Sequence, residues 1–118
     1  VDWPRFREVI DAANNIVLTS HIRADCDALG SCLGMAGILE ALGKQVRIVC
    51  GQPVPENLKF IDPENRILCI EQDIEAKDFE EADLHIILDT SAWIQLGPMA
   101  DVIRNSTYKK IIFDHHVG

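Results

Sequence analysis

The chain has 118 residues, 47% of them hydrophobic, and its 19 acidic and 11 basic residues leave a net charge of −8. This length predicts a single domain. The acidic balance argues against binding of long duplex nucleic acid, which depends on contacts between basic side chains and phosphates. No apolar run approaches the ~20 residues that span a bilayer, and no signal-peptide pattern opens the sequence, so we expect a cytoplasmic protein without a membrane partner.

Apolar periodicity predicts helices and strands in alternation. Helices are predicted over residues 2–13, 28–42, 55–60 and, after the Gly97-Pro98 break, within 93–105. Strands are predicted over residues 16–20, 45–50, 67–70, 84–89 and 109–113. The acidic stretch 71–83 is expected to be a solvated connection with one helical turn. Strands separated by helices form βαβ units, so we expect an α/β, three-layer, Rossmann-like domain with a mainly parallel sheet of about five strands.

Capping and glycine positions refine the predicted helices. Asp2 is placed as the N-cap of the first helix, and Pro4 falls in its first turn. Gly43 stands directly after the second helix, where helices commonly end. Gly34 and Gly37 lower the propensity of that helix by about 1 kcal/mol each relative to Ala. We expect them to allow a close approach of the helix to the sheet.

The four cysteines show no CxxC spacing. Cys32, Cys50 and Cys69 stand in apolar surroundings, where a reduced cysteine packs as a small hydrophobic side chain. A disulfide framework is therefore not expected. Cys26 lies between two aspartates and could act as a ligand, although a side chain that points away from its neighbours is the favoured interpretation.

Three of the predicted strands deliver histidine or aspartate to their carboxyl ends. The residues are His21, Asp25 and Asp27 after the first strand, Asp89 at the end of the fourth, and Asp114, His115 and His116 after the fifth. Open α/β sheets place their sites at this edge. Histidine and carboxylate ligands without thiolates suit Mn²⁺ or Mg²⁺ better than structural zinc. The pattern therefore predicts a two-metal site, in which Asp89 is well placed to bridge the ions.

Simpler interpretations of single residues stand beside this one. Each aspartate alone could be an ordinary loop residue, and Asp27 could cap the helix that follows, which is compatible with a ligand role. His85 lies inside the fourth strand, where a structural histidine is favoured. Arg23 either contacts a phosphate or stays in solvent.

These motifs resemble the DHH phosphoesterase superfamily. The first motif is matched by residues 21–31, the second by Asp89, and the third by Asp114-His115-His116. The resemblance implies a manganese-dependent hydrolase with two Mn²⁺ ions, which Mg²⁺ or Co²⁺ can replace. It assigns the metal ligands as His21, Asp25, Asp27, Asp89 and His115. His116 would face the substrate phosphate as a catalytic residue together with Asp89, and Asp114 would orient the ligand histidines.

The D-x-D-A-x-G-S form of the first motif indicates a branch of the family. It is similar to the short-oligonucleotide phosphodiesterases (nanoRNases) and 3′-phosphoadenosine 5′-phosphate phosphatases, which act on short oligonucleotides or nucleotide phosphates. Cyclic-dinucleotide phosphodiesterases are close neighbours, and a pyrophosphatase or exopolyphosphatase is a further alternative. A non-catalytic nucleotide-binding regulatory module is an alternative of another class. A homodimer is compatible with all of these.

The resemblance also implies parts that lie outside residues 1–118. Family members carry a fourth ligand aspartate and a second, substrate-binding domain with a glycine-rich motif. Because the sequence begins with Val1 and ends at Gly118, we expect the N-terminal part of a catalytic domain. These residues alone are expected to be nearly inactive, because no second domain excludes water or orients the substrate.

Overall fold

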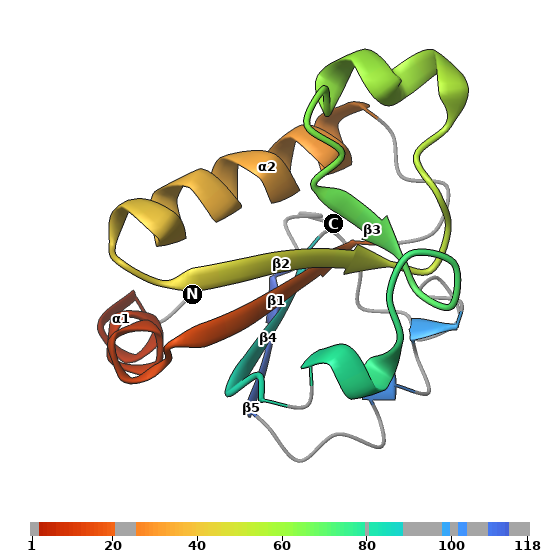
Figure 1. The fold of residues 1–118 in the computed structure, drawn as a ribbon. Helices are drawn as coiled ribbons and strands as arrows, with labels where there is room; N and C mark the ends of the chain where they lie inside the picture. The colour runs from red at the N-terminus through yellow and green to blue at the C-terminus, as the bar shows by residue number, and fades with distance from the viewer. Residues whose placement is uncertain are drawn as a thin grey trace.

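A five-stranded sheet forms the centre of the computed structural model, which describes residues 3–20, 26–79, 81–88, 98–99, 102–103 and 109–113 (Figure 1). The strands are β1 (Asn15–Ser20), β2 (Gln45–Cys50), β3 (Ile67–Cys69), β4 (Leu84–Leu88) and β5 (Lys109–Phe113). All neighbouring strands pair in parallel, in the order β3-β2-β1-β4-β5. The predicted α/β, Rossmann-like sheet is confirmed, and each predicted strand is present to within one residue at either end.

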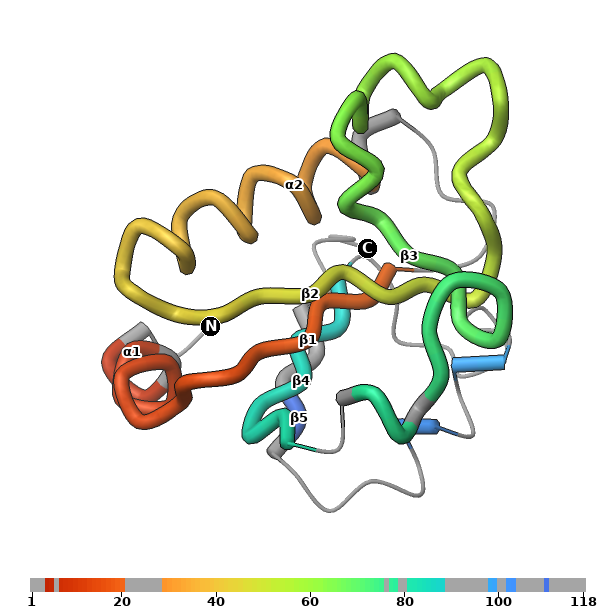
Figure 2. The backbone as a smooth tube through the Cα atoms, in the orientation of Figure 1, coloured from red at the N-terminus to blue at the C-terminus, as the bar shows by residue number. Residues whose placement is uncertain are grey.

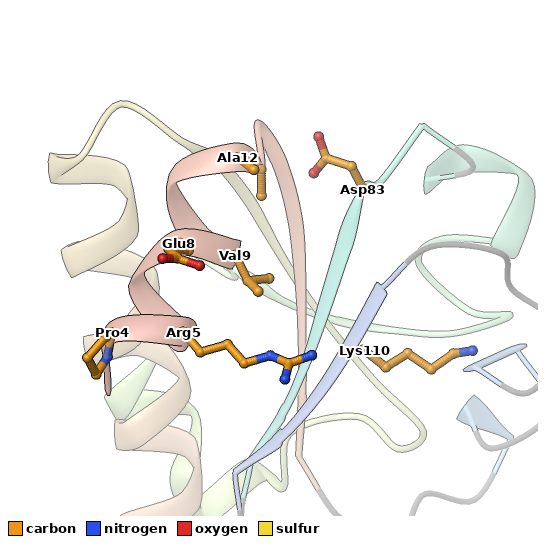
Figure 3. Close-up of a pocket in the computed structure, with 8 residues that line it drawn as sticks. Pro4, Arg5, Glu8, Val9, Ala12, Asp83 and Lys110 are labelled. Carbon is orange, nitrogen blue, oxygen red and sulfur yellow. The ribbon is translucent and has the colours of Figure 1, made fainter. Parts of the chain in front are cut away.

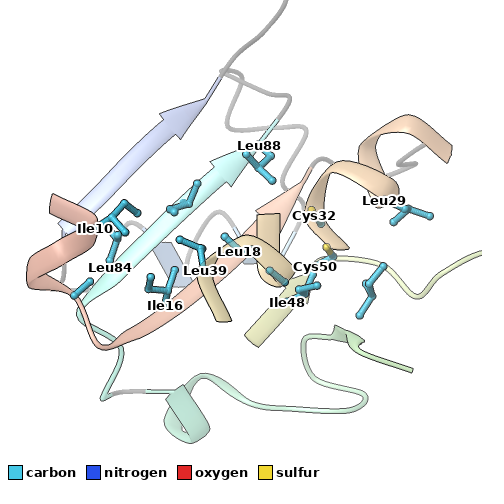
Figure 4. Packing of buried hydrophobic residues seen from close by; sticks show 14 residues of the cluster. Ile10, Ile16, Leu18, Leu29, Cys32, Leu39, Ile48, Cys50, Leu84 and Leu88 are labelled. Atoms are coloured by element: carbon cyan, nitrogen blue, oxygen red, sulfur yellow. The ribbon is translucent and has the colours of Figure 1, made fainter. Parts of the chain in front are cut away.

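Both faces of the sheet are covered, which produces three layers. One face packs against α1 (Trp3–Ala12) and α2 (Cys26–Ala41), and Figure 4 shows the buried side chains between them. The other face packs against Ile74, Ala82, Met99 and Ile103. Because the central strands are buried on both sides, they consist of nearly continuous apolar residues such as those of β4. Within the described residues, no helix has the length and apolar character needed to cross a membrane.

The carboxyl end of α2 has the geometry that its sequence predicts. Gly43 adopts a φ of +86°, a left-handed conformation that glycine enters without a steric penalty. The Gly43 N–H donates to the carbonyl of Glu40 at 2.9 Å, and the Lys44 N–H donates to the carbonyl of Leu39 at 3.1 Å. These two bonds form a Schellman motif, so the predicted helix end is confirmed.

The expectation that Gly34 and Gly37 bring α2 close to the sheet is wrong. Both residues are exposed, and a Cβ added at either would meet nothing within 4 Å. The side chains of α2 that face the sheet belong to Leu29, Cys32, Ala36 and Leu39. Their spacing of three and four residues places both glycines on the outer surface.

Carboxylates in the loops set where several strands begin. The Asp83 carboxylate accepts the backbone N–H groups of Asn14 and Asn15 at 2.9 to 3.1 Å, which ties the start of β1 to the start of β4. The buried Asp62 carboxylate accepts the N–H groups of Arg66 and Ile67 at 2.9 and 2.8 Å, at the start of β3. Some of the acidic residues therefore stabilise the fold by accepting hydrogen bonds from the backbone.

Two short 3₁₀ helices complete the described elements. Figure 2 shows the chain between β2 and β3, which contains η1 (Glu56–Ile61), extending beyond the sheet towards α2, and η1 contacts α2. The second, η2 (Ala76–Phe79), is the single helical turn expected between residues 71 and 83.

Alanine at two glycines of α2, Gly34 and Gly37, and at Gly43 just after the helix should change stability in opposite directions. Gly34→Ala and Gly37→Ala should each raise the free energy of unfolding by roughly 0.5–1 kcal/mol, because both sites are exposed helix positions with open space. Gly43→Ala should lower it by about 1 kcal/mol, because alanine is strained at a φ of +86°. Urea unfolding of the three variants would measure these changes. A loss of stability in Gly34→Ala would mean that the outer face of α2 is covered in the folded protein.

Candidate active site

The chain builds the sheet outwards in two directions from the neighbouring strands β1 and β4. From β1 the chain proceeds to β2 and β3 on one side, and it then continues with β4 and β5 on the other. In open α/β sheets, such a switch point forms a crevice outside the carboxyl ends of the two strands, and ligands bind there. The topology therefore places the candidate site beyond the last residues of β1 and β4.

The three strands on this side of the sheet end at the same level. Ser20, the last residue of β1, is the register partner of Leu88, and Leu88 is the register partner of Phe113. Neighbouring strands lie about 4.8 Å apart. The chain therefore leaves the sheet from three adjacent positions, and the next residues in the sequence are His21, Asp89 and Asp114.

Most of the predicted site residues lie outside the described residues. This holds for His21, Arg23, Asp25, Asp89, Asp114, His115 and His116, while Asp27 is described by its backbone. The ligand set thus stays a prediction. Asp27 lies within α2 and therefore does not occupy the position before the helix, where a capping residue was predicted. Asp27 lies in the first turn, where the helix dipole also favours a carboxylate. Among the described residues, no three His, Cys, Asp or Glu side chains are grouped as metal ligands.

The described residues nearest to this edge include two buried hydroxyl groups with different surroundings. The Thr19 hydroxyl donates to the carbonyl of Val49 at 2.8 Å and lies 2.6 Å from Nε2 of His85. The Ser20 hydroxyl is also buried, but it has no hydrogen-bond partner within the described part of the chain. Sequence reasoning did not single out Ser20, although a polar residue that ends an apolar strand is a signal for such a position.

His85 is a core residue, as its position within a strand predicted. A hydroxyl has a single proton, and Thr19 uses it to donate to Val49, so His85 must donate from Nε2 to Thr19. Burial, with a smaller contribution from its register partner Lys110, lowers the pKa of His85 to about 3. His85 is therefore neutral at physiological pH, and its buried ring is held by Thr19.

Three of the cysteines, Cys32, Cys50 and Cys69, are buried free thiols, as expected. Burial, together with the neighbouring Cys69, raises the pKa of Cys50 to about 11, although a backbone hydrogen bond with Ser20 partly opposes the shift. Burial also raises the pKa of Cys69, with smaller contributions from Asp73 and Glu71. Protonated thiols are poor metal ligands, so neither Cys50 nor Cys69 suits that role.

A pocket of about 910 Å³ lies at the opposite edge of the sheet. Figure 3 shows that residues of α1 line it together with Asp83, which precedes β4, and Lys110 near the start of β5. Because all strands are parallel, this pocket lies at their amino ends. We assign it no part in the candidate site.

Residues 15–118 match the family described as "DHH family, N-terminal domain". The chain belongs to the DHH family. Members of this family are phosphoesterase hydrolases that generally depend on divalent metal ions.

The chain is also similar to a solved structure. The crystal structure of an exopolyphosphatase-related protein from Bacteroides fragilis superposes with a TM-score of 0.87 at 32% sequence identity. The match covers 98% of this chain and 34% of that one. The chain thus spans about one third of the length of this solved protein.

The buried His85 should make the stability of this DHH domain pH-dependent. Its folded pKa of about 3 lies below the ordinary value of 6.5, so the unfolded chain takes up the proton first and stability falls as the pH drops below about 6.5. His85→Gln removes this contribution. Relative to the variant, the wild type should lose about 2 kcal/mol of unfolding free energy between pH 7 and pH 5, since one pKa unit corresponds to 1.36 kcal/mol.

Urea unfolding of the metal-free wild type and His85→Gln at the two pH values would measure this difference. The other three histidines are common to both proteins, so their titration cancels. Parallel pH dependences of the two proteins would contradict a neutral buried His85.

Proposed function

We propose that this chain is the catalytic part of a manganese-dependent phosphoesterase that hydrolyses short oligonucleotides or nucleotide phosphates. The observation that carries the proposal is the alignment of Ser20, Leu88 and Phe113 at the carboxyl edge of the sheet. In the sequence, each of these residues directly precedes one of the three family motifs. Three separate stretches of histidine and aspartate therefore begin beside one another at the switch point of the sheet.

The donor groups fit a hard or borderline divalent ion. The residues that would hold two Mn²⁺ ions are His21, Asp25, Asp27, Asp89 and His115, with Asp89 shared between them. Carboxylate oxygens and imidazole nitrogens are the ligands that Mn²⁺ takes in proteins, and Mg²⁺ or Co²⁺ can substitute. When bound, the two ions would supply Lewis acidity that activates water and offsets the negative charge of the phosphate.

The remaining residues of the motifs would bind and orient. His116 and Arg23 would donate hydrogen bonds to the substrate phosphate, and a charge-assisted bond to phosphate is stronger than a neutral one. Asp114 would accept a hydrogen bond from a ligand histidine and hold its ring in position. With a net charge of −8, the chain lacks the excess of basic residues needed for long nucleic acid, which favours a short substrate.

A second candidate function is the hydrolysis of polyphosphate or pyrophosphate. It is favoured by the similarity to the exopolyphosphatase-related protein, which covers nearly the whole chain. Both candidate reactions cleave a bond to phosphorus and would use the same metal ligands. They differ in what must be bound beside the phosphate, because only the first substrate class has a nucleoside.

The intact protein should hydrolyse a dinucleotide or 3′-phosphoadenosine 5′-phosphate in the presence of Mn²⁺. An assay panel of these two substrates, a cyclic dinucleotide, pyrophosphate and polyphosphate would measure the preference through kcat/KM. Preference for polyphosphate would select the second candidate function. Nucleotide binding without turnover of any substrate would identify a regulatory module instead.

Removal of single ligands should eliminate turnover without unfolding the protein. Asp27→Ala and His115→Ala in the intact protein should each lower kcat/KM by at least about a hundredfold, because each removes a metal ligand. Asp11→Ala is the matched control, since Asp11 is an exposed carboxylate of α1 that lies 4.0 Å from Nε of Arg7. The control should retain full activity. Wild-type activity in both ligand variants would refute the ligand assignment.

A further inference from the structure

Ser20 holds a buried hydroxyl for which the described fold offers no use. The residue is 0% exposed, and its Oγ has no hydrogen-bond partner among the described residues. A buried hydroxyl without a partner lowers stability, and alanine would fill the same position without that cost. The adjacent Thr19 is equally buried, but its hydroxyl is satisfied by Val49 and His85. Of the two buried hydroxyls, the one without a partner among the described residues is therefore that of Ser20, the last residue of β1.

The alternation of side chains along β1 determines which face of the sheet Ser20 occupies. Ile16 and Leu18 belong to the cluster beneath α1 and α2, whereas Val17 belongs to the cluster on the other face. Ser20 follows Leu18 by two residues and therefore shares its face. The Ser20 hydroxyl thus lies on the side of the sheet that α2 covers, at the edge where the candidate site begins.

The predicted ligand carboxylate nearest to this hydroxyl in the sequence is that of Asp25. Asp25 follows Ser20 by five residues, in the part of the sequence that connects β1 to α2. The sheet-facing positions of α2 are Leu29, Cys32, Ala36 and Leu39, and they pack on the face of the sheet that Ser20 shares. Among the assigned ligand carboxylates, we therefore take Asp25 as the acceptor for the Ser20 hydroxyl.

Resting on the proposed function, we propose that Ser20 is a positioning residue of the metal centre, whose hydroxyl donates a hydrogen bond to the Asp25 carboxylate when metal is bound. A hydroxyl that donates to a carboxylate forms a charge-assisted bond. Such partners hold ligand carboxylates in the orientation that the metal requires, and their loss typically lowers metal affinity 10- to 100-fold. The cost of the unsatisfied hydroxyl in the metal-free protein is then recovered in the metal-bound state.

The test compares Ser20→Ala with wild type in the intact protein, using Mn²⁺ alone as the probe. Isothermal titration calorimetry should show a 10- to 100-fold weaker Mn²⁺ affinity in the variant. The thermal midpoint of the metal-free variant should be equal to or higher than that of the wild type. A hydroxyl with a merely structural role would produce the reverse pattern, with a lower midpoint and unchanged affinity.

Thr19→Val is the matched control, because it removes the neighbouring hydroxyl on the opposite face of the same strand. It should lower the thermal midpoint, since Val49 and His85 lose their partner, and leave the Mn²⁺ affinity within threefold of the wild type. Wild-type affinity in Ser20→Ala, or a lowered midpoint of its metal-free form, would overturn this inference and leave the proposed function intact. Failure of the wild type itself to bind Mn²⁺ would overturn the proposed function and this inference with it.

Discussion

The parallel register of β1 with β4 and of β4 with β5 is the constraint on which the candidate site depends. Parallel strands that are buried on both faces tolerate no shift by one residue, because such a shift would exchange the side chains of the two faces. Ser20, Leu88 and Phe113 are therefore held at one level of the sheet. The motif residues that follow them in the sequence start from adjacent positions because the core requires this alignment.

Hydrogen bonds through a single side chain reinforce the central strands. Thr19 of β1 donates to the carbonyl of Val49 in β2 and accepts from His85 in β4, so its hydroxyl links three strands in the interior of the protein. A satisfied buried network of this kind adds specificity to an apolar core, since a shifted strand would leave several polar groups without partners. Thr19 and Ser20 lie on opposite faces of the sheet at the end of β1. The Thr19 side chain is bonded to β2 and β4, whereas Ser20 lies on the face that α2 covers.

Acidic residues have two roles that composition alone does not separate. Asp62 and Asp83 accept backbone N–H groups at the starts of strands, and Arg66 forms a bidentate ion pair with Glu40 at 2.7 and 2.8 Å. These groups stabilise the loops at which the sheet is assembled. The aspartates of the motifs follow the carboxyl ends of strands instead. Because all strands of the sheet are parallel, their starts lie at one edge and their ends at the other. The structural carboxylates lie at the edge where strands start, and the carboxylates expected to hold metal ions follow the strand ends.

The strands, their parallel class and the end of α2 at Gly43 were predictable from the sequence, because short apolar runs, alternating elements and a glycine after a helix are local properties. The motif residues likewise identified the family and the carboxyl edge of the sheet. Local pattern could not assign the faces of α2, since a helix that is apolar nearly all round offers no clear stripe, and Gly34 and Gly37 were assigned to the wrong side. Only the tertiary structure aligned the ends of β1, β4 and β5, satisfied Thr19 through His85, and left Ser20 without a partner among the described residues. Each of these depends on contacts between segments that are distant in sequence, and the packing of the whole sheet decides them.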